Sequence, residues 1–184
     1  MRKITVFTNV SLDGFFEAPG HDLSGFSNDF EAFPSGADNP VDTLLWGHTT
    51  YESMQFWSTP QAEQMMPEVA RFMTATQKVV ASHQPFDPGW QNVTVISGDV
   101  PGGIRRLKEQ PGKGILIFGS SKLCVSLLQE GLIDELQIVV NPVLFGAGST
   151  LFQGLPGKTL LILKETRRFK SGAVMLIYDP RPPE

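Results

Sequence analysis

Residues 115–152 constrain the fold of this chain more than any other stretch, because they read as a strand, a glycine turn, a helix and a second strand. The run 115–118 is short, continuous and apolar, which is typical of a strand covered on both faces. Gly119 interrupts this run, and Gly131 is placed to end the helix that follows. Residues 133–140 then predict the second strand.

The glycine turn also predicts a chemical property. Ser120 or Ser121 is suited to cap the helix through its hydroxyl oxygen. A helix N-terminus that follows a strand through glycine presents free backbone N–H groups, and such groups attract a phosphate. Many α/β proteins begin an ordinary capped helix in the same way, so this turn taken alone favours the ordinary helix over a binding site.

Strands and helices alternate along the rest of the chain. Strands are expected at residues 3–10, 41–46, 78–81 and 93–96, and helices from about residue 49, at 63–76 and at 102–109. Residues 159–167 and 173–178 predict a hairpin-like pair of strands. Repeated strand–helix–strand units imply an α/β fold with a mostly parallel central sheet, helices on both faces and an antiparallel C-terminal strand pair.

Composition limits the partners of the protein. The 184 residues carry 15 basic and 19 acidic side chains, a net charge of −4, without a basic run, which argues against nucleic acid or an anionic membrane as the main partner. No linker divides the chain, so we expect residues 1–184 to form a single domain. No apolar stretch is long enough to span a bilayer, and residues 1–3 lead into a strand rather than a signal peptide, so the expected setting is cytoplasmic.

Three other chemistries find little support in the sequence. Cys124 is the only cysteine, and its place among apolar residues of the expected helix favours packing over nucleophilic catalysis. His21, His48 and His83 are scattered without the spacing of metal ligands, so we expect no metal site. Residues 119–121 do not match the nucleophile elbow of Ser-His-Asp hydrolases.

Three turns are expected at one edge of the sheet. Residues 47–50, 81–83 and 119–121 each follow a strand, and ligands bind at the carboxyl ends of the strands in such sheets. All three turns offer backbone N–H groups or hydroxyls, and two of them include a histidine. Together they predict an anion site better than any one of them does, since a long dinucleotide needs several anchor points.

These segments resemble a known family. Residues 46–53, WGHTTYES, look like the glycine-x-x-threonine-aromatic-glutamate signature of dihydrofolate reductases. Residues 80–85, VASHQP, are similar to the adenosine-side turn of those enzymes, and residues 117–121, IFGSS, to their glycine-rich pyrophosphate turn. The resemblance implies a three-layer, dihydrofolate reductase-like fold.

Three further segments point to one branch of this superfamily. The sequences SLDG at 11–14, LIDEL at 132–136 and NPVLFGAG at 141–148 resemble the reductase domain of the bifunctional riboflavin-biosynthesis deaminase-reductase and its stand-alone relatives. The resemblance covers residues 4–178 in order, and no deaminase zinc motif precedes it, so we expect a stand-alone member. It implies an oxidoreductase that uses NADPH to transfer a hydride to a pterin- or ribosylaminopyrimidine-like heterocycle.

The resemblance assigns roles by position. The implied cofactor-binding residues are Gly47, Thr49 and Thr50 at the pyrophosphate, Ser82 and His83 at the adenosine and its 2′-phosphate, His48 at the position of a phosphate-binding arginine, and Gly119, Ser120 and Ser121 at the pyrophosphate and nicotinamide side. Residues 28–33 resemble the helix that carries the pterin-binding carboxylate, which implies a catalytic role for Asp29. Asp13 is a second candidate carboxylate, because its turn lies beside the nicotinamide in the riboflavin branch. Ordinary turn chemistry explains an aspartate before glycine equally well.

Three positions depart from the family pattern. His48 and His83 stand where the family usually has arginine, which stays charged and grips phosphate with two hydrogen bonds, whereas a histidine with a pKa of about 6.5 is mostly neutral at neutral pH. Ser120 replaces the second of two paired glycines. We expect these changes to weaken recognition of the 2′-phosphate. They keep a second hypothesis open, a nucleotide-binding module of the same fold whose catalysis is lost or altered.

The C-terminal strand pair predicts a second copy of the chain as a partner. Residues 160–163 and 174–177 are consecutive apolar runs. Strands with apolar side chains on both faces leave an exposed patch when they lie at a solvent-facing edge. One face of the strand pair would cover the core, and the other would meet a second subunit about a two-fold axis. Members of the resembled branch commonly dimerise. We therefore expect a homodimer.

Overall fold

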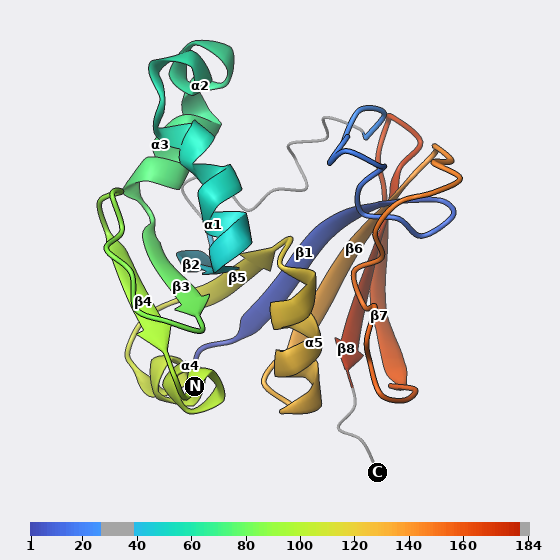
Figure 1. Ribbon diagram of the computed structural model, residues 1–184. Helices are drawn as coiled ribbons and strands as arrows, with labels where there is room; N and C mark the ends of the chain where they lie inside the picture. Colours follow the sequence, from blue (N-terminus) through green and yellow to red (C-terminus); the bar gives the residue numbers. More distant parts are fainter. Residues whose placement is uncertain (27–38, 181–184) are drawn as a thin grey trace. The chain divides into compact units, whose positions relative to one another are not determined.

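The computed structural model describes residues 1–26 and 39–180 (Figure 1). The elements within these residues are, in chain order, β1 (Ile4–Ser11), β2 (Val41–Gly47), α1 (His48–Met54), the 3₁₀-helix η2 (Gln55–Ser58), α2 (Pro60–Met65), α3 (Pro67–Ala75), β3 (Gln77–Ser82), β4 (Val93–Ser97), α4 (Val100–Glu109), β5 (Gly114–Phe118), α5 (Ser121–Gln129), β6 (Glu135–Asn141), β7 (Leu161–Arg168) and β8 (Val174–Pro180).

These strands hydrogen-bond into one sheet with the order β4-β3-β2-β5-β1-β6-β8-β7. The pairs β3–β4, β2–β3, β2–β5 and β1–β6 are parallel. Strand β8 runs antiparallel to both β6 and β7. The predicted α/β class, with a mostly parallel sheet and an antiparallel C-terminal pair, is confirmed.

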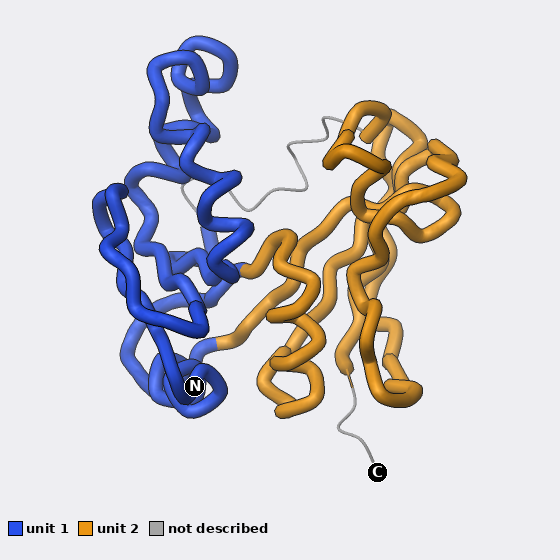
Figure 2. The backbone as a smooth tube through the Cα atoms, in the orientation of Figure 1, with its two compact units in different colours: residues 1–2, 34–116 blue, residues 3–33, 117–184 orange. Residues whose placement is uncertain are grey.

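Contacts within the chain divide it into two compact units, which Figure 2 draws in two colours. Unit 1 comprises residues 1–2 and 34–116, and unit 2 comprises residues 3–33 and 117–184. The chain passes from unit 1 to unit 2 inside β5, where no Pro- or Gly-rich linker marks the division. The single domain over residues 1–184 stays a prediction.

Helices α1 and α3 cover one face of the strands in unit 1. Leu44 and Trp46 of β2 share this face with Lys78 of β3, because Leu44 and Lys78 are register partners. Tyr51 of α1 lies 6.5 Å from Trp90, ring centroid to ring centroid, and Trp90 stacks on Trp46 at 6.0 Å. Lys78 donates a hydrogen bond to a carbonyl oxygen of α3.

Helix α4 covers the opposite face of these strands. Gly103 of α4 lies so close to β4 that a Cβ added there would be 2.5 Å from Cγ2 of Ile96. Only a residue without a side chain permits this approach of helix and strand. Helices on both faces of the sheet make three layers, as the sequence predicts.

One expected helix is wrong in its extent. We expected a single helix over residues 63–76, but α2 ends at Met65 and α3 begins at Pro67. Proline lacks an N–H group and is favourable only in the first turn of a helix, so Pro67 starts a new one. Thr59 marks the start of α2, because its Oγ1 accepts a hydrogen bond from Ala62 N at 3.3 Å.

The C-terminal strands of unit 2 differ in burial. Met175 and Ile177 of β8 are buried, whereas every residue of β7 is exposed. The exposed fractions of Leu161, Ile162 and Leu163 are 42%, 40% and 52%. Strand β7 ends the sheet order, so within the described residues the apolar first part of this edge strand, residues 161–163, is exposed, while its remaining residues are polar or charged.

Candidate functional site

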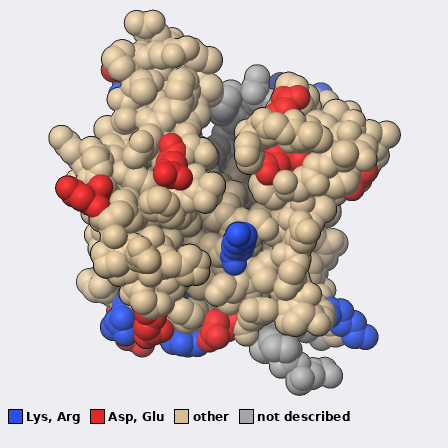
Figure 3. Space-filling view, in the orientation of Figure 1, with Lys and Arg blue, Asp and Glu red and all other residues tan. Residues whose placement is uncertain are grey.

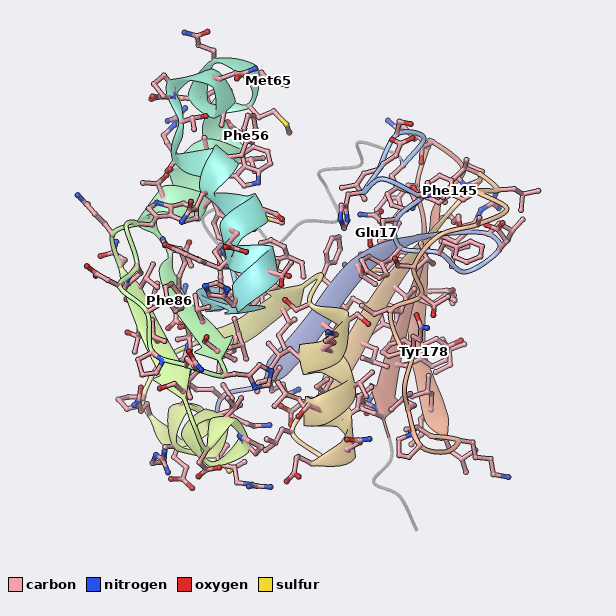
Figure 4. The ribbon with its side chains drawn as sticks, in the orientation of Figure 1. Glu17, Phe56, Met65, Phe86, Phe145 and Tyr178 are labelled. Atoms are coloured by element: carbon pink, nitrogen blue, oxygen red, sulfur yellow. The ribbon has the colours of Figure 1, made fainter. Side chains whose placement is uncertain are left out.

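Two of the three predicted turns lie next to each other in unit 1, at the carboxyl ends of β2 and β3. Gly47 ends β2 and is the register partner of Ala81, the residue before Ser82. His48 opens α1, and its ring lies edge-on to Phe86, which Figure 4 labels, with 4.5 Å between ring centroids. Because Phe86 belongs to the segment after β3, this contact joins the two turns.

The side chains of these two turns are open to a ligand. His83 and Thr49 are exposed, and His48, Thr50 and Ser82 are half-buried. The side chain of His48 has 43% of its surface exposed. Both imidazoles are therefore accessible to an anion.

The third turn joins β5 to α5 in unit 2, and its backbone is left-handed at two successive residues. Gly119 has a φ of 68°, and Ser120 has a φ of 63° with a ψ of 52°. Glycine adopts this conformation freely, whereas it costs a serine about 1 kcal/mol. Ser120 occupies the N-cap position of α5 without making a side-chain cap. A capping residue is normally extended, which explains why the left-handed Ser120 does not cap.

The predicted cap by Ser120 or Ser121 is therefore wrong. The hydroxyl of Ser121 donates instead to the carbonyl oxygen of Leu151 at 2.7 Å, which ties the start of α5 to a loop within unit 2. Leu151 lies 30 residues away from Ser121 in the sequence. The local sequence therefore could not show that the Ser121 hydroxyl makes this hydrogen bond.

Helix α1 also begins without a side-chain cap, at Gly47. Helices α2 and α4 are capped by Thr59 and Asp99, and α3 begins with Pro67, which has no N–H group to satisfy. Uncapped first-turn N–H groups are available to water or to a bound anion. The two helices that follow the predicted nucleotide turns, α1 and α5, thus both begin without a side-chain cap.

Asp13 is held by the loop after β6. Its carboxylate accepts hydrogen bonds from the Ser11 hydroxyl at 2.6 Å and from the backbone N–H groups of Phe145 at 3.2 Å and Gly146 at 2.7 Å. The Ser11 hydroxyl above all, and then these N–H groups, hold the pKa of Asp13 below its usual range. These contacts support the turn-chemistry interpretation, an ionised carboxylate that anchors a loop. A catalytic role for Asp13 stays a prediction, and Asp29 lies outside the described residues.

A carboxylate–imidazole pair that sequence reasoning missed lies in unit 2, where Figure 4 labels Glu17. Oε2 of Glu17 is 2.8 Å from Nδ1 of His21, and the side chains are 17% and 84% exposed. The hydrogen bond from Glu17, together with its charge, raises the pKa of His21. The Glu17 backbone pairs with Ser149, which fixes the carboxylate against the loop after β6. Glu17 and His21 are four residues apart, but they lie in a turn rather than a helix, so the sequence did not predict a contact between their side chains.

Lys78 of β3 is fully buried, which its sequence context did not indicate. Its Nζ donates to the carbonyl oxygens of Met73, Thr74 and Thr76 at 2.9, 3.1 and 2.6 Å and lies 4.6 Å from the Trp90 ring centroid. Burial lowers the pKa of Lys78 to about 8. The three carbonyl oxygens and the aromatic ring offset part of the desolvation cost. Lys78 therefore closes the C-terminal end of α3.

Cys124 packs as the sequence predicts. It is buried, and burial raises the pKa of its thiol to about 12, which suppresses the reactive thiolate.

Within the described ranges, no three His, Cys, Asp or Glu side chains gather where they could hold a metal ion. No helix in the same ranges is long and apolar enough to cross a bilayer. On the face drawn in Figure 3, basic side chains lie scattered among acidic ones.

The eight-stranded sheet, with its glycine turns at the carboxyl ends of the strands, is that of a dihydrofolate reductase-like α/β protein. Residues 2–175 match the RibD C-terminal domain, and the chain belongs to this family. The resemblance to the riboflavin branch is confirmed.

Relatives match along nearly the whole chain. The Bacillus subtilis (strain 168) protein YwjB is 30% identical over 188 residues, which cover 96% of this chain and 97% of YwjB. A crystal structure from Shewanella sp. PV-4 has a TM-score of 0.75 at 20% identity and covers 97% of this chain and 99% of its own. The riboflavin biosynthesis reductase Rib7 of Saccharomyces cerevisiae has a TM-score of 0.63 at 14% identity, covering 98% of this chain and 90% of its own. At such identities the two structures establish the fold.

Proposed function

We propose that this protein is an NADPH-dependent reductase that transfers a hydride to a pterin- or ribosylaminopyrimidine-like heterocycle of riboflavin- or folate-type metabolism. Membership of the RibD C-terminal domain family supports the reaction class. The observation that carries the nucleotide part is the start of α5, where left-handed Gly119 and Ser120 precede a first turn without a side-chain cap. Such a turn suits the pyrophosphate of a dinucleotide.

In this proposal, the residues of this chain bind the nucleotide and orient it. Backbone N–H groups at the start of α5 receive a phosphate, and His48 and His83 supply positive charge in unit 1 when they are protonated. NADPH supplies the hydride when it is bound. A carboxylate or water supplies the proton that completes the reduction. Asp29 and Asp13 are the candidate carboxylates, and the loop contacts of Asp13 favour the other sources.

Calorimetric titration with NADPH and NADH at several pH values tests the cofactor. We expect the NADPH affinity to rise as the pH falls from about 8 to about 6.5, because only the imidazolium form of His48 or His83 attracts the 2′-phosphate, which keeps most of its charge above its second pKa of about 6. NADH lacks this phosphate and should respond much less. His48→Gln and His83→Gln should flatten the response, whereas His21→Gln, which removes the remaining histidine, serves as the matched control.

Two results would count against this cofactor proposal. An NADPH/NADH affinity ratio that does not change with pH would contradict the contact between either histidine and the 2′-phosphate. The absence of both heat and a thermal shift at millimolar nucleotide would overturn nucleotide binding altogether.

A binding module without catalysis is the second candidate function. The histidines at positions 48 and 83, in place of the arginines usual in the resembled family, favour it. Loss of NADPH absorbance in the presence of a panel of pterins and ribosylaminopyrimidines distinguishes the two. Turnover with any member supports the reductase, and nucleotide binding without turnover of the panel supports the module.

We also propose a homodimer that covers β7. The exposed apolar residues of this edge strand support a second copy as the partner, because an open apolar edge otherwise invites uncontrolled association. Light scattering at micromolar concentration should give about twice the chain mass of 20.2 kDa. A mass equal to one chain would contradict the dimer. The cytoplasmic setting depends on the sequence alone and stays a prediction.

A further inference from the structure

A pocket of about 580 Å³ lies in unit 1 between α4 and the sheet. Val79 of β3 and Thr94 of β4 line it from the sheet side, and Arg106 and Leu107 line it from α4. Its volume lies within the range of small-molecule sites, about 300–1,000 Å³. The pocket is therefore large enough for a compact metabolite.

The pocket shares no lining residue with the predicted nucleotide turns of the same unit. Thr43 lines it near the start of β2, whereas Gly47 ends that strand. Four residues of extended chain span about 13 Å. The lining also reaches Ser97 at the end of β4, but it lies on the α4 side of the sheet and includes none of residues 47–50 or 81–83.

Charge gives the pocket its chemical preference. Its lining includes two arginines, Arg2 and Arg106, and no Asp or Glu. The side chain of Arg2 is 6% exposed. Its Nε donates to the carbonyl oxygen of Lys113 at 2.7 Å, and its Nη2 donates to the Asp42 carboxylate and to Oγ1 of Thr43. These bonds leave the two N–H groups of Nη1 for a ligand.

The surroundings of Arg2 hold its guanidinium in place before any ligand binds. The other oxygen of Asp42 accepts from Lys113 N at 2.7 Å, so the carboxylate that orients Arg2 is itself fixed. A Cβ added at Gly112 would lie 2.8 Å from that oxygen and 3.1 Å from Cζ of Arg2. A guanidinium fixed in this way loses little entropy when it binds an anion.

The rest of the lining suits a compact, partly polar body. Gln77 donates through Nε2 to Oγ1 of Thr94 at 3.1 Å, so this polar wall is already ordered. Val79 and Leu107 add apolar surface. The C-terminal end of α4 brings negative partial charge, and Arg106 offsets it.

We propose that this pocket binds a small organic anion, with its phosphate or carboxylate group paired to Arg2 and Arg106 and its body against Val79 and Leu107. The site is independent of the proposed reductase activity, because it shares no residue with the nucleotide turns. Arg106 is exposed and Arg2 is buried, so the anion would enter past Arg106.

Calorimetric titration of the full chain with glycerol 3-phosphate and with malate tests the proposal, at an ionic strength held constant with sodium chloride. Three variants accompany the wild type. Arg106→Gln removes the exposed cation, Thr94→Phe fills the pocket with a residue that still favours a strand, and Arg105→Gln is the control, since Arg105 makes the same charge change on the same helix without lining the pocket.

We expect at least one probe to bind, with affinity reduced about tenfold or more by Arg106→Gln and by Thr94→Phe and changed less than about twofold by Arg105→Gln. Binding of glycerol 3-phosphate alone identifies a phosphate site, and binding of malate alone identifies a carboxylate site. The proposal is overturned when neither probe binds at about 10 mM. It is also overturned when Arg105→Gln weakens binding as much as Arg106→Gln does, because the effect is then one of net charge.

Discussion

Helices α4 and α5 are similar in length, 10 and 9 residues, yet they begin in opposite ways. At the start of α4, Oδ1 of Asp99 accepts a hydrogen bond from Gly102 N at 2.9 Å. At the start of α5, Ser120 occupies the same capping position with a left-handed backbone and makes no side-chain cap. One N-terminus has a side-chain cap, and the other does not.

The difference has an energetic scale. A side-chain cap contributes about 1 kcal/mol, and the left-handed serine costs about 1 kcal/mol, so α5 gives up about 2 kcal/mol relative to α4. Local costs of this kind persist where the backbone must meet a ligand. Helix α3 also begins without a side-chain cap, and its C-terminal end is closed by Lys78. The start of α4 thus carries a side-chain cap, and the start of α5, at a predicted nucleotide turn, does not.

The largest effect is expected from Gly119→Val. A β-branched residue at a φ of 68° is strained, so we expect a stability loss of about 2 kcal/mol and a nucleotide affinity reduced about tenfold or more. Gly131→Val is the control, since Gly131 lies just past the other end of α5 with a φ of 63° and open space around it. Denaturant unfolding should show similar losses for both variants, and calorimetry should show lost NADPH affinity for Gly119→Val alone. Equal affinities in the two variants would show that the start of α5 does not meet the nucleotide.

The strands and the order of the helices were predictable because the hydrophobic pattern follows each element closely. The apolar run 115–118 became most of β5, and Gly131 ends α5 with a positive φ, as expected. The break at Pro67 was predictable as well, since a proline is favourable only in the first turn of a helix. Pattern alone was sufficient wherever a segment buries one face or both.

The details of the site could not be predicted, because they depend on contacts between distant segments. Asp13 receives N–H groups from residues more than 130 positions away, at Phe145 and Gly146. Lys78 is buried only because α3 ends over it and Trp90 covers it. The left-handed backbone of Ser120 contradicts the local preference of serine, so composition indicated a cap where the structure has none.

A smaller effect is expected from Asp99→Ala, which opens the start of α4. Loss of the hydrogen bond to Gly102 N should lower the free energy of unfolding by about 1 kcal/mol. Because α4 is not part of a predicted nucleotide turn, NADPH affinity should not change. Asp99→Asn retains a capping oxygen and should recover most of the stability. A weaker nucleotide affinity in Asp99→Ala would remove the distinction between the two helix starts.

The smallest effect is expected from Ser120→Gly, which restores the paired glycines that the resembled family has at this turn. Glycine relieves the left-handed strain of about 1 kcal/mol but gains freedom in the unfolded chain, so we expect a net stability gain of at most about 0.5 kcal/mol. Ser120→Ala keeps the strain and should give no gain, which separates the backbone effect from removal of the hydroxyl. NADPH affinity in Ser120→Gly should equal or exceed that of the wild type, because the backbone conformation that presents the N–H groups is then adopted at lower cost. A loss of stability of about 1 kcal/mol or more in both variants would assign Ser120 a structural role through its hydroxyl and would weaken the case that α5 starts open for a ligand.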